Sequence, residues 1–171
     1  MTALAALVSA RAGDWHRAEA LLRELEQGFP RNTVIKVYWA PAIRAAIAIE
    51  SGNAEHALQS LQATIPYESA SPPPMGLASL YPIYLRGEAY LLRRQGEAAA
   101  REFRKIVDRP GLVLNFTLHA VSFPRLARAR ALAGDTAGAR QAYQDFFRLW
   151  KDADSEIPIF TQAKGEYARL E

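Results

Sequence analysis

The sequence predicts an all-α fold, an array of helical hairpins, and three observations point to it. Alanine, the best helix former, is the commonest residue, with 32 of 171 positions. No stretch of six or more residues alternates cleanly between apolar and polar side chains, as a half-buried strand would. Small residues recur at a period near 40 residues, as in helical repeat proteins. These residues are Ala18, Ala57, Ala99 and Ala139.

Each repeat is expected to be one helical hairpin. A second small residue precedes each of the four by 12 positions, and two helices can cross closely where side chains are small. These partners are Ala6, Ala45, Gly87 and Ala127, and we expect Gly87 to face Ala99. Glycines in the turns end the first helices, and Asp14, Asn53 and Asp135 can cap the second ones. The third turn contains Gly96 but lacks the glycine–acid pair.

The elements follow in order as one domain over 1–171. We expect four hairpin units at about 1–32, 33–77, 78–116 and 117–154, and a C-terminal capping helix in 155–171. The nine helices are expected near 3–12, 15–28, 33–51, 54–65, 79–94, 97–107, 117–133, 136–151 and 157–170. Prolines and glycines make 66–77 and 108–116 connections between hairpins. Pro82 should lie in a first helical turn, and Pro41 and Pro124 should kink their helices.

Composition and charge exclude several classes of protein. The chain has no cysteine, so it has neither disulfides nor thiolate metal sites. No apolar run approaches the roughly 20 residues that span a bilayer, so membrane insertion is not expected. The net charge of +3 does not form the dense basic stripe of a nucleic-acid binder. A nucleic-acid partner is therefore not favoured. We expect the chain to be cytoplasmic; the alternative is that it is the extracytoplasmic part of a membrane-anchored parent protein.

No catalytic, cofactor-binding or metal-binding residues are expected. His16, His56 and His119 belong to different units. The acidic cluster of Asp152, Asp154 and Glu156 lacks the glycine and the distal glutamate of a calcium-binding loop. No serine has a histidine and an acid in a recognised catalytic arrangement. The sequence therefore predicts a protein without enzymatic activity.

The repeat resembles the tetratricopeptide repeat family, and this resemblance implies that the hairpins form a right-handed superhelical array. The stretches that carry the resemblance are Gly87-Glu88-Ala89-Tyr90 with Ala99 and Phe103, Gly134-Asp135 with Ala139 and Tyr143, and Gly13-Asp14-Trp15 with Ala18 and Pro30. Further stretches, including 81–91 and 139–146, are similar to the C-terminal repeats of bacterial eukaryotic-like serine/threonine kinases and of some winged-helix regulators. No kinase motif is present. The resemblance implies a module for protein interaction, sensing or scaffolding, which would be a C-terminal fragment of a larger signalling protein. The alternatives are a nucleic-acid-binding repeat and the effector domain of a transcriptional regulator.

The first helices of such an array line its concave side, where extended peptides bind. The groove candidates are exposed positions on first helices, away from the small packing residues. They are Trp39, Tyr84, Glu88, Arg125 and Arg128. Arginine holds carboxylates through a planar fork of donors, so the expected ligand is a peptide with an acidic side chain or a free C-terminal carboxylate. Glu88 could instead neutralise one of the arginines in the free protein.

The first helix is apolar almost all round, whereas the terminal helix of an array should have one polar face. Only Ser9 and Arg11 interrupt the apolar residues from position 3 onward. We therefore expect this end to be covered by an upstream domain, a preceding repeat or a second copy of the chain.

Overall fold

The computed structural model describes residues 2–69, 79–113, 116–154 and 156–170, and every regular element in them is helical. The α-helices are α1 (Thr2–Arg11), α2 (Trp15–Gly28), α3 (Ala40–Glu50), α4 (Ala54–Ser60), α5 (Tyr81–Leu92), α6 (Gly96–Val107), α7 (Pro110–Val113), α8 (Leu118–Leu132), α9 (Thr136–Leu149) and α10 (Pro158–Ala168). A π-helical turn, η1 (Ile35–Trp39), leads into α3, and a 3₁₀ helix, η2 (Leu61–Tyr67), continues α4. All nine expected helices have a counterpart, and α7 adds a short helix inside the expected connection 108–116. Most of the other connection, 66–77, lies outside the described residues.

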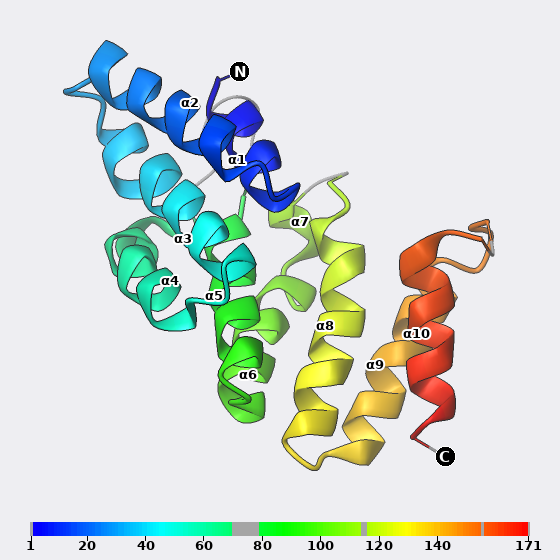
Figure 1. The fold of residues 1–171 in the computed structure, drawn as a ribbon. Coiled ribbons are helices and arrows are strands. Elements are labelled where there is room, and N and C mark those ends of the chain that lie inside the picture. The colour runs from blue at the N-terminus through cyan, green and yellow to red at the C-terminus, as the bar shows by residue number, and fades with distance from the viewer. Residues whose placement is uncertain (1, 70–78, 114–115, 155, 171) are drawn as a thin grey trace.

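The helices pack as consecutive antiparallel pairs, and each pair packs on the next (Figure 1). The pairs are α1/α2, α3/α4, α5/α6 and α8/α9. The first helices of successive pairs touch, α1 against α3, α3 against α5, and α5 against α8. The α1/α2 pair lies at one end of the molecule, and α10 lies against α9 at the other (Figure 1). The prediction of an all-helical fold made of hairpins is confirmed at this level.

The small residues that define the repeat are packed between helices. Seven of the eight are alanines, and all seven are completely enclosed: Ala6, Ala18, Ala45, Ala57, Ala99, Ala127 and Ala139. The expectation that Gly87 faces Ala99 stays a prediction, and the nearest side chain to this glycine is that of Phe103. A Cβ atom added at Gly87 would lie 2.7 Å from the ring of Phe103, so this glycine makes room for the phenylalanine.

Three of the four hairpin turns have the local chemistry that the sequence predicts. Gly13, Gly52 and Gly134 adopt positive φ angles of 79°, 77° and 82°, which glycine tolerates without a steric penalty. The following residue caps the second helix in each case. Asp14 accepts a hydrogen bond from the Arg17 N–H at 3.1 Å, Asn53 from the His56 N–H at 3.1 Å, and Asp135 from the Gly138 N–H at 2.8 Å.

The third turn is built differently from the way we expected. Arg94, not a glycine, takes the left-handed conformation with a φ of 55°. Gln95 stands at the capping position and makes no side-chain capping bond. Gly96 is the first residue of α6, where an added Cβ would meet backbone atoms of Ala133 at 2.6 Å and Ala129 at 2.7 Å. Its role is therefore a close approach between α6 and the end of α8.

The prolines behave in three ways. Pro82 lies in the first turn of α5, as predicted. Pro41 lies in the first turn of α3, directly after η1, in which the Ala40 N–H donates to the Ile35 carbonyl five residues back. The helical irregularity near Pro41 is therefore a π-helical turn that precedes it. Pro124 lies inside α8, and helix continues on both sides of it.

The core has two buried clusters that meet at α5. Leu85 and Ala89 of this helix belong to the N-terminal cluster with α1 to α4. Ile83 and Tyr84 belong to the C-terminal cluster with α6, α8, α9 and α10. The polar residue Glu88 lies on the same helix, and its surroundings define the candidate site.

Candidate functional site

An open groove of about 490 Å³ lies where α1, α3, α5 and α8 come to their C-terminal ends. All four are the first helices of their hairpins. The groove has a charged part and an apolar part. Its lining residues are Arg11, Ile49, Glu50, Glu88, Leu91, Leu92, Arg125, Arg128 and Leu132. Three of the five residues that the sequence suggested are among them, namely Glu88, Arg125 and Arg128.

Arg125 of α8 joins Tyr84 and Glu88 of α5 into one contact. Its Nε atom donates to the Tyr84 hydroxyl at 3.1 Å, and its Nη2 atom lies 2.9 Å from Glu88 Oε1. Arg125 of α8 therefore lies beside Tyr84 and Glu88 of α5. The contact also decides the question left open for Glu88: it neutralises Arg125 in the free protein.

Arg11 and Glu50 complete this network, and sequence reasoning missed both. Arg11 Nη2 donates to Glu88 Oε1 at 3.1 Å. Arg11 Nη1 lies 2.8 Å from Glu50 Oε1 and 2.8 Å from Glu88 Oε2, although these contacts are not aligned as hydrogen bonds. The sequence did contain a signal for this pair. Arg11 and Glu50 are the last residues of α1 and α3, two first helices that neighbour each other, so opposite charges stand at matching positions.

Arg128 points toward the C-terminal helix. Its Nε donates to Glu166 Oε2 of α10 at 2.7 Å, and the Tyr143 hydroxyl of α9 donates to the same oxygen at 2.6 Å. The Nη2 atom of Arg128 is enclosed and has no hydrogen-bond partner among the described residues. A buried donor without a partner costs about 1–3 kcal/mol. Because this atom is enclosed, a ligand can reach Arg128 only through the part of its side chain that stays exposed.

Burial and charge shift the pKa values of the network in a consistent direction. Burial raises the pKa of the Tyr84 hydroxyl, and the charge of Glu88 adds to this effect. Burial alone would lower the pKa of Arg11, but the acidic groups that face it, Glu88 foremost, raise it on balance. The pKa of Arg125 is also raised, against the effect of burial, by Tyr84 and Glu88. At neutral pH the tyrosine is therefore neutral and both arginines carry their charge.

The structure corrects the expectation that all five candidates are exposed. Trp39 is only 3% exposed and packs edge-on against Tyr38 in the N-terminal core, so it is a core residue. Its place in η1, one residue before α3, turns it inward. Tyr84 and Glu88 are also buried, at 6% each. The side chains of Arg125 and Arg128 keep 30% and 20% of their surface.

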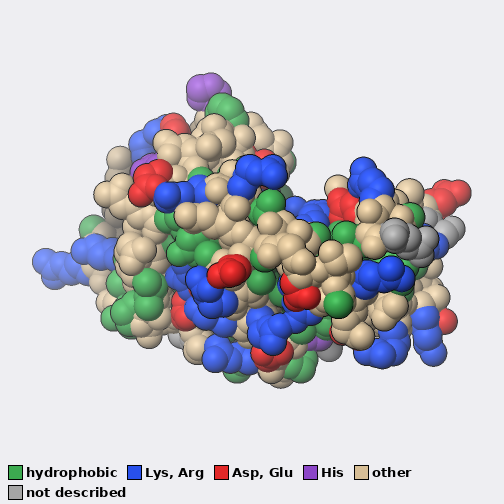
Figure 2. All heavy atoms as spheres, turned by 90° about the horizontal axis from the view of Figure 1, so that it is seen from below, with side chains coloured by type: hydrophobic (Ala, Val, Ile, Leu, Met, Phe, Trp, Pro, Cys, Tyr) green, Lys and Arg blue, Asp and Glu red, His purple; other side chains and the backbone are tan. Residues whose placement is uncertain are grey.

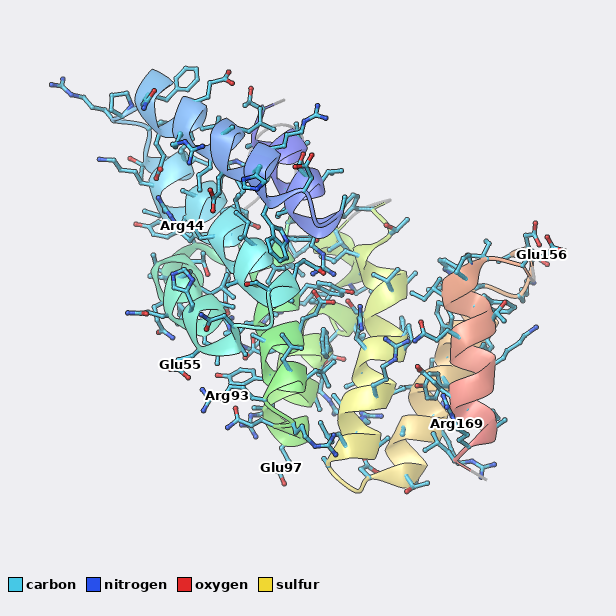
Figure 3. The ribbon with its side chains drawn as sticks, viewed as in Figure 1. Arg44, Glu55, Arg93, Glu97, Glu156 and Arg169 are labelled. Carbon is cyan, nitrogen blue, oxygen red and sulfur yellow. The ribbon has the colours of Figure 1, made fainter. Side chains whose placement is uncertain are left out.

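The molecular surface around the groove carries both signs of charge. Figure 2 shows the molecule from below, the side on which α5 and α8 end, and acidic side chains lie among the basic ones there. Ion pairs between neighbouring hairpins contribute to this mixture. Arg93, just after α5, pairs with Glu55 of α4, and the two are drawn close together in Figure 3.

A second cluster of charges lies away from the groove and is structural. The buried Arg86 of α5 donates to Glu102 of α6 at 3.0 Å and also to Glu68, which follows η2. Lys105 lies 3.0 Å from Glu102. The cluster fixes the end of η2 onto the α5/α6 hairpin.

Neither a cluster of metal ligands nor a membrane-spanning helix occurs in the described part of the chain. Nowhere in that part do three histidine, aspartate or glutamate side chains come together as metal ligands. None of its helices combines the length and the apolar character needed to cross a membrane.

Comparisons with protein-family models, with curated proteins and with solved structures find no match to this chain.

Proposed function

We propose that the chain is a non-enzymatic protein-interaction module, a right-handed superhelical array of hairpins of the tetratricopeptide type, whose groove binds a peptide. The observation that carries the proposal is the groove itself, to which four successive hairpins each contribute the end of their first helix. Stacked hairpins commonly present an extended concave binding surface of this kind. The sequence resemblance supports a place in a larger bacterial signalling polypeptide, in the cytoplasm.

The partner that fits best is a peptide with an acidic side chain or a free C-terminal carboxylate. Three arginines and two glutamates line the groove, so its side chains leave an excess of positive charge. The carboxylate of a ligand competes with Glu88 for Arg125 and with Glu166 for Arg128. Leu91, Leu92 and Leu132 offer apolar area beside these charges.

The alternative of a nucleic-acid-binding repeat is less favoured. Such a surface needs basic and aromatic side chains in repeated alternation, whereas acidic groups interrupt the basic ones on the face in Figure 2. In the other alternative, the chain is the effector domain of a transcriptional regulator. The groove chemistry is then the same, and only the parent protein differs.

The experiment is selection from randomised short peptides with free C-termini against three proteins. These are the wild type, Arg128→Gln in the groove, and Arg101→Gln, an exposed arginine on α6 as the matched control. The wild type and the control should enrich acidic peptides. Arg128→Gln should bind the selected peptides at least tenfold more weakly, about 1.4 kcal/mol. Equal binding by Arg128→Gln, or enrichment only of single-stranded RNA in a parallel selection, would contradict the proposal.

A further inference from the structure

The groove does not end at Arg128. A second depression of about 310 Å³ lies between α8, α9 and α10, and Arg128 and Leu132 line both it and the groove. Its other walls include Ala131, Tyr143 and Leu170. The two depressions are therefore neighbours along α8, with the Arg128 side chain between them.

Both depressions offer apolar surface next to the guanidinium group. On one side, Leu92 is 48% exposed, and Leu91 and Leu132 are partly exposed beside it. On the other side, Ala131 and Leu170 are partly exposed. The depressions measure about 490 and 310 Å³, so each has room for one apolar side chain of a ligand. Covering the exposed apolar area favours binding.

A carboxylate of the chain itself already contacts Arg128 between the two depressions. Glu166 of α10 delivers a carboxylate oxygen to both Arg128 Nε and the Tyr143 hydroxyl. The combined lining holds four arginines and three glutamates, Arg169 after α10 being the fourth (Figure 3). A net positive lining is complementary to one acidic group, and in a complex that group competes with Glu166 for Arg128.

We infer that the ligand is an extended peptide in which an acidic residue stands between two apolar residues, and that α10 forms the wall of the second apolar subsite. The inference rests on the proposed function and adds the order in which apolar and acidic side chains of the ligand bind along the groove. The acidic group contacts Arg128, one apolar side chain enters the leucine-lined part of the groove, and the other packs between Ala131 and Leu170.

The test uses synthetic peptides with capped ends in which one glutamate is flanked by two leucines, separated by one to three serines. Companion peptides replace either leucine by alanine, or the glutamate by glutamine. Binding is measured by fluorescence anisotropy on the wild type and on Ala131→Leu, which fills the second depression. The wild type should bind the best two-leucine peptide about tenfold more tightly than either one-leucine peptide.

In Ala131→Leu this advantage of the second leucine should disappear, while the dependence on glutamate remains. Ala137→Leu, at an exposed position of α9, is the matched control and should bind like the wild type. Since the added leucine could disturb α8, Leu170→Ala provides a second variant, which should weaken only the two-leucine peptide. If glutamate matters but the second leucine never does, the inference fails and the proposed function stands. If no peptide binds, both fail.

Discussion

At the scale of single residues, glycine and alanine set the distances between helices. The alanine positions could be predicted because a small residue at a fixed spacing has one economical explanation, a close helix crossing. Gly96 could not be assigned in the same way. In the sequence it looks like a turn glycine, and only the packed α8 shows that its missing Cβ makes room for another backbone.

Replacing Gly96 by alanine should therefore destabilise the protein by about 1–3 kcal/mol, because backbone atoms cannot move aside as a flexible side chain can. Gly165, in the middle of α10, has no atom near its absent Cβ. Gly165→Ala should stabilise by about 0.5–1 kcal/mol through helix propensity. Urea denaturation of the two variants measures both effects. A neutral Gly96→Ala variant would show that α6 and α8 are less close than described.

At the scale of elements, the sequence predicted nine helices and the small residues that are enclosed between them. It could not predict which of the larger residues of the first helices belong to the core and which line the groove. Trp39 and Arg125 both belong to first helices, but η1 turns Trp39 into the core while α8 directs Arg125 to the groove. Arg11 and Glu50 were missed because their partners are far apart in sequence: Arg11 is 77 residues from Glu88.

The network around Glu88 links α1, α3, α5 and α8, and a single substitution should separate its two effects. Glu88→Gln leaves Arg11 and Arg125 without their shared carboxylate. We expect a loss of stability of about 1–3 kcal/mol, since buried charges lose their partner. We also expect tighter binding of acidic peptides, because an internal competitor is removed.

Thermal denaturation and peptide titration of the same variant measure these two effects. Glu19→Gln, which removes an exposed ion pair with Arg23 on α2, is the control and should change stability by no more than about 0.5 kcal/mol. A stable Glu88→Gln variant with unchanged peptide affinity would mean that the network contributes neither to packing nor to recognition.

At the scale of the whole molecule, α5 lies between two cores, and the groove lies beside this junction. The two ends of the molecule differ in the side chains that they expose. Val8 of α1 is 66% exposed, whereas α10 presents mostly polar side chains outward. The prediction that α1 is covered by another domain, a repeat or a second copy stays a prediction.

The most direct test of the central claim is to map peptide contacts by NMR. Amide chemical shifts of the labelled protein are followed during titration with the two-leucine, one-glutamate peptide. We predict that the largest changes occur at the ends of α1, α3, α5 and α8, centred on Glu88, Leu91, Arg128 and Leu132, and extend to α10. Changes confined to the second helices α2, α4 and α6, or to the exposed side of α1, would contradict the claim that the groove is the binding surface.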